Sequence, residues 1–542
     1  MTDNQQIFVT EVKQILKDLD AKLLDFKVSD DCPVWTIEYP YMGKIWSLRV
    51  KFDGWSIDVL PEVYWCRPTP IWGWPHTSIS GEVCVNDQEG LEYDPCDVKG
   101  VLRWLLEGAA NILDSNHRIS AKERICRFSD ELEGYLLNDG AFSISLPIPL
   151  DVTKVTYGEV QTAVKGKVSP VTPRVLNINQ GTSEHHNCQQ QRLGILDVSI
   201  GQLADISAEW DMKWWNQFIA RLSASQNKIA ISKKNHGLVL RVPNIYGHAL
   251  LLLYKGIHST HKNRTYVIKR QDHSYLVKRT GSQPLHKHVV IVGCGAIGAR
   301  VAEHLALAGV EKLTLIDDDF FSPDNLGRHV LGKSAIGKRK VDELAKLLKE
   351  RMPGINVVPK SSLIQKILAS SNEVQSADVI VLATGNSVIE RSIIRSAFQH
   401  HWRALLVSTS VEAGGLGGHA ISMQPGTPGC LDCLYWDPDT LRPATRLRTS
   451  LIAPDQKVTR QLTGCGAFTP YSALDATRTA TLAVERVLSN DVGYALWVGE
   501  AQLAKLEGIT ASHTYDALIH GRISSNLSPP MYTRPGCPCC GV

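Results

Sequence analysis

The chain has 542 residues, of which 43% are hydrophobic and 21% charged, and its formal net charge is +3 at pH 7. A chain of this length is too long to fold around a single hydrophobic core, so two to four domains are expected. The small charge argues against a basic nucleic-acid surface, no apolar run approaches the ~20 residues of a membrane span, and the polar start is unlike a signal peptide. The 13 cysteines are scattered apart from clusters near residues 430 and 540, a pattern typical of a reducing, cytoplasmic location.

Residues 1–140 have the pattern of an α+β module. An amphipathic helix is predicted over residues 5–19. Strand-like runs bounded by Gly, Pro or Asp follow at 34–40, 45–52 and 56–60. A loop rich in Trp, Pro and Gly then leads past Cys84 to a helix near 97–114, for which Asp97 is a suitable N-cap.

Residues 141–280 are predicted to form a mixed α/β connecting domain. Prolines near its start mark a connector, and two later runs have the apolar composition of buried strands, Gly237–Val242 and Ala249–Tyr254.

Residues 281–542 alternate between strand and helix patterns. Strands are predicted at 288–293, 312–316, 378–384 and 404–410, and helices at 296–308, 335–350 and 471–488. This alternation predicts a doubly wound, Rossmann-like parallel sheet.

A glycine-rich turn opens this last region. Gly293, Gly295 and Gly298 follow an apolar strand and begin a helix, where small residues let the backbone approach phosphate and the helix N-terminus favours negative charge. Asp317 ends the next strand and is placed to bind a ribose hydroxyl. These features alone also fit a dinucleotide dehydrogenase.

Further motifs favour a different nucleotide chemistry. Asp317-x-Asp319 is followed by Asn325-Leu-x-Arg328 and then by a glycine-lysine-x-lysine run that ends at Lys340. In order and spacing this resembles the signature of ThiF and ubiquitin-activating adenylyltransferases. The resemblance implies ATP and Mg²⁺ as cofactors, with Arg328 and Lys340 neutralising triphosphate charge as a carboxylate attacks the α-phosphorus. A solvated charged loop is the alternative reading of the run.

One position departs from that family. The strand that begins at Asp378 usually ends in an aspartate that helps to hold magnesium, whereas this chain has Gly385 and Asn386 there. An amide oxygen can still ligate Mg²⁺ but brings no charge, and Asp319 is placed to compensate.

Two Cys-x-x-Cys pairs predict a structural zinc site. They are Cys430 with Cys433, and Cys537 with Cys540, and Cys539 is the expected spare. Four thiolates at this spacing suit tetrahedral zinc, and redox chemistry is the alternative.

Cys465 lies between these pairs and has glycines on both sides. The glycines would let it swing, and a helix N-terminus nearby would favour its thiolate. Resemblance to the activating enzymes, which place their thioester-forming cysteine in this interval, implies a catalytic role. A buried, inert cysteine is the alternative.

The segment from Trp74 to Cys84 resembles the active-site loop of ubiquitin-conjugating enzymes. Pro75, Gly81 and Cys84 fall in register with that family, which implies that Cys84 is a thioester nucleophile. His76 stands where the family has an asparagine that supports the oxyanion. An imidazole can donate to an oxyanion or deprotonate an amine, and its charge changes near pH 6.5. An ordinary structural histidine is the alternative.

The domain order resembles bacterial activating–conjugating fusions, above all the fusion of type II CBASS antiphage operons. That resemblance implies adenylation of a protein C-terminus, a thioester relay from Cys465 to Cys84, and conjugation to an acceptor protein or amine. The expected passenger is a cGAS/DncV-like nucleotidyltransferase, and a homodimer formed through the adenylation domain is expected. No membrane or nucleic-acid partner is expected.

The sequence is also compatible with three other functions. The passenger could be a ubiquitin-like protein of another operon. The chain could be a sulfur-carrier adenylyltransferase, in which Cys84 would have no role. Finally, it could be a scaffold that binds ATP without turnover, for which Asn386 is the best support.

Overall fold

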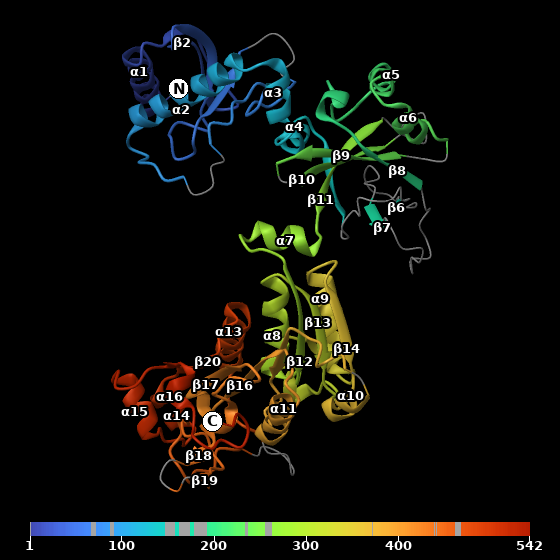
Figure 1. The fold of residues 1–542 in the computed structure, drawn as a ribbon. Helices are drawn as coiled ribbons and strands as arrows, with labels where there is room; N and C mark the ends of the chain where they lie inside the picture. Colours follow the sequence, from blue (N-terminus) through green and yellow to red (C-terminus); the bar gives the residue numbers. More distant parts are fainter. Residues whose placement is uncertain are drawn as a thin grey trace. The chain divides into compact units, whose positions relative to one another are not determined.

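The chain forms two compact units, Met1–Arg270 and Gln271–Val542 (Figure 1). The computed structural model describes residues 2–66, 72–86, 91–146, 158–161, 174–177, 192–233, 237–245, 247–254, 263–370, 372–437, 440, 442–460 and 468–541.

The first unit begins with an antiparallel sheet of four strands in the order β1-β2-β3-β4, against which two helices pack. The elements are α1 (Asp3–Asp18), β1 (Lys22–Ser29), β2 (Cys32–Tyr41), β3 (Lys44–Lys51), β4 (Glu62–Trp65) and α2 (Val98–Arg118). Apolar residues of α1 and α2 share one core with Trp35, Leu48 and Phe52. Asp97 caps α2 as predicted, because its carboxylate accepts a hydrogen bond of 2.8 Å from the backbone N–H of Gly100.

Two strand assignments in this sheet differ from the sequence prediction. The predicted strand at 56–60 is wrong, since those residues form bends and the fourth strand is β4. The Ser56 hydroxyl donates to the Asp58 carboxylate (2.8 Å), a local polar contact that favours a turn. Strand β1 was not predicted, because nearly all of its side chains are exposed and the alternating pattern is missing.

The rest of the first unit contains a mixed sheet of seven strands in the order β5-β11-β10-β9-β8-β6-β7. The elements are α3 (Ala121–Phe128), α4 (Leu132–Asn138), β5 (Phe142–Leu146), β6 (Gly158–Gln161), β7 (Arg174–Asn177), β8 (Arg192–Asp197), α5 (Met212–Ala220), α6 (Ala224–Ala230), β9 (Gly237–Asn244), β10 (Gly247–Tyr254) and β11 (Arg264–Arg270). The two strands predicted in this region are present as β9 and β10. Helices α3 and α4 share a core with α5 and with β8 to β10.

The second unit contains a sheet of eight strands in the order β14-β13-β12-β15-β16-β17-β20-β21, in which the five strands from β14 to β16 are parallel. The elements are α7 (His273–Arg279), β12 (Leu285–Val292), α8 (Ala296–Leu307), β13 (Val310–Ile316), α9 (Lys340–Arg351), β14 (Asn356–Lys360), α10 (Ile364–Ser370), β15 (Val379–Leu382), α11 (Ser387–Gln399), β16 (Leu405–Val411), β17 (Gly417–Met423), α12 (Leu431–Leu434), α13 (Ala473–Ser489), β20 (Gly493–Val498), α14 (Ala501–Leu506), α15 (His513–Ile519), β21 (Asn526–Leu527) and α16 (Pro529–Tyr532). The predicted doubly wound α/β fold is confirmed.

Two hydrophobic cores lie on the two faces of this sheet. One contains apolar residues of α8, α9 and α13, and the other contains those of α10 and α11 (Figure 1). The predicted helix at 335–350 begins only at Lys340, because residues Lys333–Ala335 form a separate 3-10 turn. Among the residues that the structure describes, no helix is both long and apolar enough to cross a membrane.

Candidate functional site

A cavity of about 210 Å³ opens beside the turn that follows β12. Such a place, outside the carboxyl ends of parallel strands, is where doubly wound folds bind ligands. The structure brings together there most of the cofactor-binding residues predicted from the sequence. Its lining consists of Gly293, Gly295, Ala296, Asp317, Asp319, Asn325, Arg328, His329, Lys340, Ala383, Thr384 and Tyr471.

The glycines shape this cavity by close approach of backbone. Gly293 has a φ of +87°, and a Cβ atom on it would lie 2.6 Å from the carbonyl oxygen of Ala383. A Cβ atom on Gly298 would lie 1.9 Å from the carbonyl oxygen of Gly293, so helix α8 packs against the turn only because residue 298 has no side chain. Gly298 therefore supports the turn from behind and does not line the cavity.

Asp317 holds the turn in place through backbone amides. Its Oδ2 accepts a hydrogen bond of 2.7 Å from the N–H of Cys294, and its Oδ1 accepts one of 2.8 Å from the N–H of Asp319. Because Asp317 also lines the cavity, and each carboxylate oxygen can accept more than one hydrogen bond, it retains acceptor capacity for a ribose hydroxyl.

Lys340 is a nearly buried cation at the start of α9. Its side chain is 9% exposed, and its Nζ lies 2.7 Å from Oδ2 of Asp319, whose side chain is 66% exposed. Because the lysine side chain is nearly buried and the carboxylate is exposed, the carboxylate has more freedom to move than the ammonium has. Lys340 thus provides a positive charge at the wall of the cavity.

Arg328 and Asn325 also line the cavity. The Arg328 guanidinium stacks 4.6 Å from the centre of the Tyr471 ring and donates to the carbonyl oxygen of Thr469 (3.3 Å). Asn325 accepts a hydrogen bond from the N–H of Ser322 (3.1 Å), which fixes the short turn that precedes the arginine. Arg328 is therefore pre-oriented for an anion in the cavity.

His329 is a lining residue that the sequence reasoning missed. Its Nδ1 accepts from the N–H of Leu331 (3.1 Å), so the proton is on Nε2, which donates to the carbonyl oxygen of Cys294 (2.9 Å). Burial lowers the pKa of His329 to about 4, so it is neutral at pH 7. The only sequence feature that could have pointed to His329 is its position directly after Arg328. No sequence feature marked Tyr471 or Thr384 as lining residues.

Asn386 does not line this cavity. Its Oδ1 accepts from the backbone N–H groups of Val388 (3.1 Å) and Ile389 (3.2 Å), so the side chain acts as the N-cap of α11. Asp317, Asp318 and Asp319 place carboxylate oxygens within 4.8 Å of one another at the cavity edge and are the described acidic residues that could hold a magnesium ion there.

The four predicted zinc ligands converge in the second unit. The Sγ atoms of Cys430, Cys433, Cys537 and Cys540 all lie within 4.8 Å of one another. Three pairs are separated by 3.6 to 3.9 Å, which matches the ~3.8 Å expected between sulfurs that share a tetrahedral zinc with Zn–S bonds of ~2.3 Å. The donor set therefore fits zinc. Between the first two cysteines, the buried Asp432 carboxylate accepts from Arg391 and Arg395 of α11.

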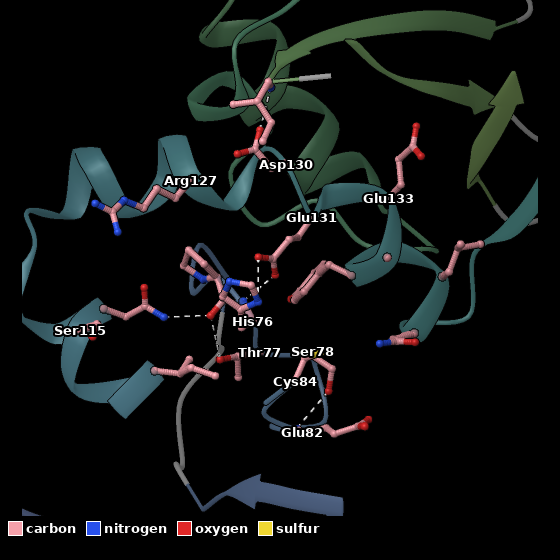
Figure 2. Close-up of a pocket in the computed structure, with 18 of the residues that line it drawn as sticks. His76, Thr77, Ser78, Glu82, Cys84, Ser115, Arg127, Asp130, Glu131 and Glu133 are labelled. Atoms are coloured by element: carbon pink, nitrogen blue, oxygen red, sulfur yellow. Dashed lines mark hydrogen bonds and ion pairs between the residues drawn. The ribbon is translucent and has the colours of Figure 1, made fainter. Parts of the chain in front are cut away.

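Cys84 lies in the first unit, on the wall of a cavity of about 880 Å³ (Figure 2). The loop that carries it is held by backbone hydrogen bonds, among them one of 2.8 Å from the N–H of Cys84 to the carbonyl oxygen of His76 and one of 2.7 Å from the N–H of Trp65 to the carbonyl oxygen of Gly81. An exposed thiol on a fixed turn beside an open cavity can reach a second macromolecule.

His76 shares this cavity and has an unusual backbone. Its φ is +56°, a left-handed conformation that costs energy for a residue with a Cβ atom. Glu131 compensates, because its carboxylate accepts from the N–H of His76 (2.5 Å) and lies 3.3 Å from Nδ1 of the ring. Cys465 lies outside the described residues, so its catalytic role stays a prediction.

The fold and the first cavity define a doubly wound α/β domain whose glycine-rich turn borders a cavity lined by both basic and acidic side chains. Residues 273–504 match the model of the ThiF family. The chain is 30% identical over 200 residues to the uncharacterized protein y4oA of Sinorhizobium fredii, a match covering 34% of this chain and 32% of that protein. It is 29% identical over 222 residues to the ATP-dependent ubiquitin transferase-like protein Cap2 of Escherichia coli, covering 39% of this chain and 36% of that protein.

These matches confirm the resemblance to ThiF-containing fusions of the CBASS type. The matched segments make up only a third or so of the relatives' own lengths, 32% and 36%. Among solved structures, the crystal structure of E. coli MccB with ATP is 18% identical, covers 47% of this chain and 66% of that chain, and has a TM-score of 0.32.

Proposed function

We propose that the chain activates the C-terminal carboxylate of a protein with ATP and conjugates it to an amine. The observation that carries the proposal is the cavity beside the glycine turn, where the cations Arg328 and Lys340 and the carboxylates Asp317 and Asp319 line one small space. The names of the similar proteins, ATP-dependent ubiquitin transferase-like protein Cap2 among them, support the same chemistry.

The activation step uses this cavity. A carboxylate oxygen attacks the α-phosphorus of ATP, the new P–O bond forms an acyl-adenylate, and pyrophosphate leaves. Arg328 and Lys340 stabilise the negative charge that gathers on the phosphates. Magnesium held by Asp317 and Asp319 would supply further charge neutralisation there.

The relay follows by acyl transfer between thiols. The Cys465 thiolate attacks the acyl carbon and AMP leaves. The Cys84 thiolate then attacks the same carbon, the bond to the Cys465 sulfur breaks, and the acyl group passes to Cys84. Finally an amine attacks, an amide forms, and the Cys84 thiol is released. Its exposed position on a cavity wall supports Cys84 as the last carrier.

The four-cysteine cluster has a structural part in this proposal. Cys430, Cys433, Cys537 and Cys540 would hold zinc and so tie the α12 segment to the C-terminal segment. A closed set of four thiolates leaves no open position for substrate.

The proposed passenger is a cGAS/DncV-like nucleotidyltransferase in an antiphage operon, and a homodimer in the cytoplasm is the proposed state of the chain. The support for this passenger is the resemblance to Cap2-type proteins. The alternative passenger is a ubiquitin-like protein, which would use the same cavity and the same thiols.

The test is to co-express the Cys84→Ser variant with its genomic neighbours. The serine should trap the passenger as a slower-reacting oxyester, and peptide mass spectrometry at position 84 would identify it. A nucleotidyltransferase C-terminus there would establish the proposed passenger, and a small ubiquitin-like protein would establish the alternative. If position 84 carries no protein in either the Cys84→Ser variant or the wild type, the relay is wrong.

A further inference from the structure

The wall of the Cys84 cavity carries more acid than base. Among the described residues that line it, the acidic side chains come from the cysteine loop and from the turn and helix that follow α3, whereas the two basic side chains come from α3 and β11. The charged lining residues are Glu82, Arg127, Asp130, Glu131, Glu133 and Lys269. Arg127 is also paired with Glu123 on α3 (2.8 Å). The electrostatic potential of the cavity therefore favours a positively charged group, such as the ammonium group of a lysine side chain.

Two of the acids are occupied by backbone groups that fix the wall. Asp130 accepts from the N–H of Ile245 (2.9 Å), which directly follows β9, and Glu133 accepts from the N–H of Leu250 (3.3 Å), which lies in β10. Burial raises the pKa of Glu133, and burial also raises that of Glu82. Glu131 differs from both, because its carboxylate contacts another titratable side chain of the cavity.

That side chain is His76. The Glu131 carboxylate accepts from the backbone N–H of His76 and lies 3.3 Å from Nδ1 of its ring, as the dashed lines in Figure 2 show. The ring and the carboxylate therefore lie close enough to form an ion pair once the imidazole is protonated. The carbonyl oxygen of the same residue accepts from the N–H of Cys84. His76 thus contacts the acid through its backbone N–H and its ring, and the backbone of the nucleophile through its carbonyl oxygen.

We infer that Glu131 is the residue that positions His76 as the base for the amine that attacks the thioester on Cys84. The inference rests on the proposed function. The ammonium gives one proton to the neutral imidazole of His76, and the neutral amine attacks the thioester carbon on Cys84. The C–N bond forms, the C–S bond breaks, and the second proton of the nitrogen goes to the departing sulfur. Glu131 stabilises the imidazolium and holds its orientation.

The experiment loads Cys84 without ATP or passenger. The full chain is acylated by exchange with an N-acetylglycine thioester, and peptide mass spectrometry follows the acyl group on the peptide that contains Cys84. Discharge is then measured with Nα-acetyl-lysine, which must lose a proton to react, and with hydroxylamine, which is neutral and needs no base. The two nucleophiles separate base catalysis from damage to the loop.

Discharge by Nα-acetyl-lysine should slow about 10²-fold in His76→Ala and about 10-fold in Glu131→Gln, with the double variant no slower than His76→Ala. Glu131→Asp should recover part of the rate. Glu11→Gln, which alters an exposed acid on α1 outside the cavity, should match the wild type.

An unchanged lysine discharge in Glu131→Gln, or an equal loss with hydroxylamine, would overturn the inference and leave the relay standing. A Cys84 that takes up no acyl group would contradict the relay and this inference together.

Discussion

The imidazole of His329 donates a hydrogen bond of 2.9 Å to the carbonyl oxygen of Cys294, and so ties the arginine-bearing loop to the glycine turn. Both residues are buried, and neither was singled out by the sequence motifs. Because His329 can make this bond and accept from Leu331 only in its neutral form, the geometry of the nucleotide cavity depends on a histidine that stays unprotonated.

The first prediction concerns this histidine and acid pH. Burial lowers the pKa of His329 to about 4 from its ordinary 6.5, so the unfolded chain binds the proton more readily than the folded one. Its contribution to stability is present above pH 6.5 and falls as the pH drops from 6.5 to 4. At pH 5 the loss should be about 2 kcal/mol relative to pH 7.5.

The check is the pH dependence of unfolding. The His329→Gln variant lacks the titrating group, so its free energy of unfolding should fall less between pH 7.5 and pH 5 than that of the wild type. His520→Gln, at an exposed position, is the control and should keep the wild-type slope. Equal slopes in all three proteins would show that His329 is not held neutral by the fold.

The second prediction concerns the buried cation. Replacement of Lys340 by alanine should lower ATP–pyrophosphate exchange by about 10²-fold or more, because it removes the charge held against Asp319 at the cavity. Lys346→Ala is the matched control, since that lysine lies on the same helix with its side chain 71% exposed. If Lys340→Ala retains ATP–pyrophosphate exchange, this cavity is not the site of the activation step.

The structure could be predicted best from the sequence where the interactions that determine it lie within one segment of the chain. Gly293 and Gly298 lie within one strand–turn–helix unit, and every side chain of Val289–Val292 is buried, so the turn and its strand could be predicted from neighbouring residues. Asp317, Arg328 and Lys340 came from motif spacing, and the structure places all three on one cavity.

Features that depend on distant partners could not be predicted in this way. Strand β17 begins with Gly417 and Gly418, which read as a loop, yet a Cβ atom on Gly418 would meet Thr479 of α13 and Trp497 of β20. Strand β1 is exposed along most of its length and so lacks an alternating pattern. The Glu131–His76 contact joins residues on different elements, and nothing near Glu131 in the sequence marks it.

The third prediction concerns the four-cysteine cluster. The purified protein should contain one zinc ion per chain by elemental analysis, and Cys433→Ser should lose it. Unfolding of the variant should occur about 10 °C lower, because the cluster joins segments far apart in the sequence.

Cys539 provides the comparison for this experiment. It adjoins Cys540 but is not among the four clustered thiols, so Cys539→Ser should retain zinc and wild-type stability. Loss of zinc from Cys539→Ser but not from Cys433→Ser would mean that the ligand set is assigned wrongly.

The fourth prediction concerns Glu390, a buried carboxyl behind the nucleotide cavity. It accepts from the hydroxyl of Ser408 (2.7 Å) and from the hydroxyl (2.8 Å) and N–H (2.9 Å) of Thr384, which lines the cavity. Desolvation by burial nevertheless dominates and raises the pKa of Glu390 to about 7. The folded chain therefore holds this proton more tightly than the unfolded chain does.

Stability should consequently fall as the pH rises from about 5 through 7, by an amount on the order of 2 kcal/mol between pH 5 and pH 8. Glu390→Gln keeps an acceptor oxygen but cannot ionise, so its stability relative to the wild type should improve as the pH rises over that interval. Chemical unfolding at the two pH values measures this difference directly. If the wild type and the variant lose stability equally, the carboxyl is ionised in the folded protein, and the hydrogen-bond donors around it outweigh its burial.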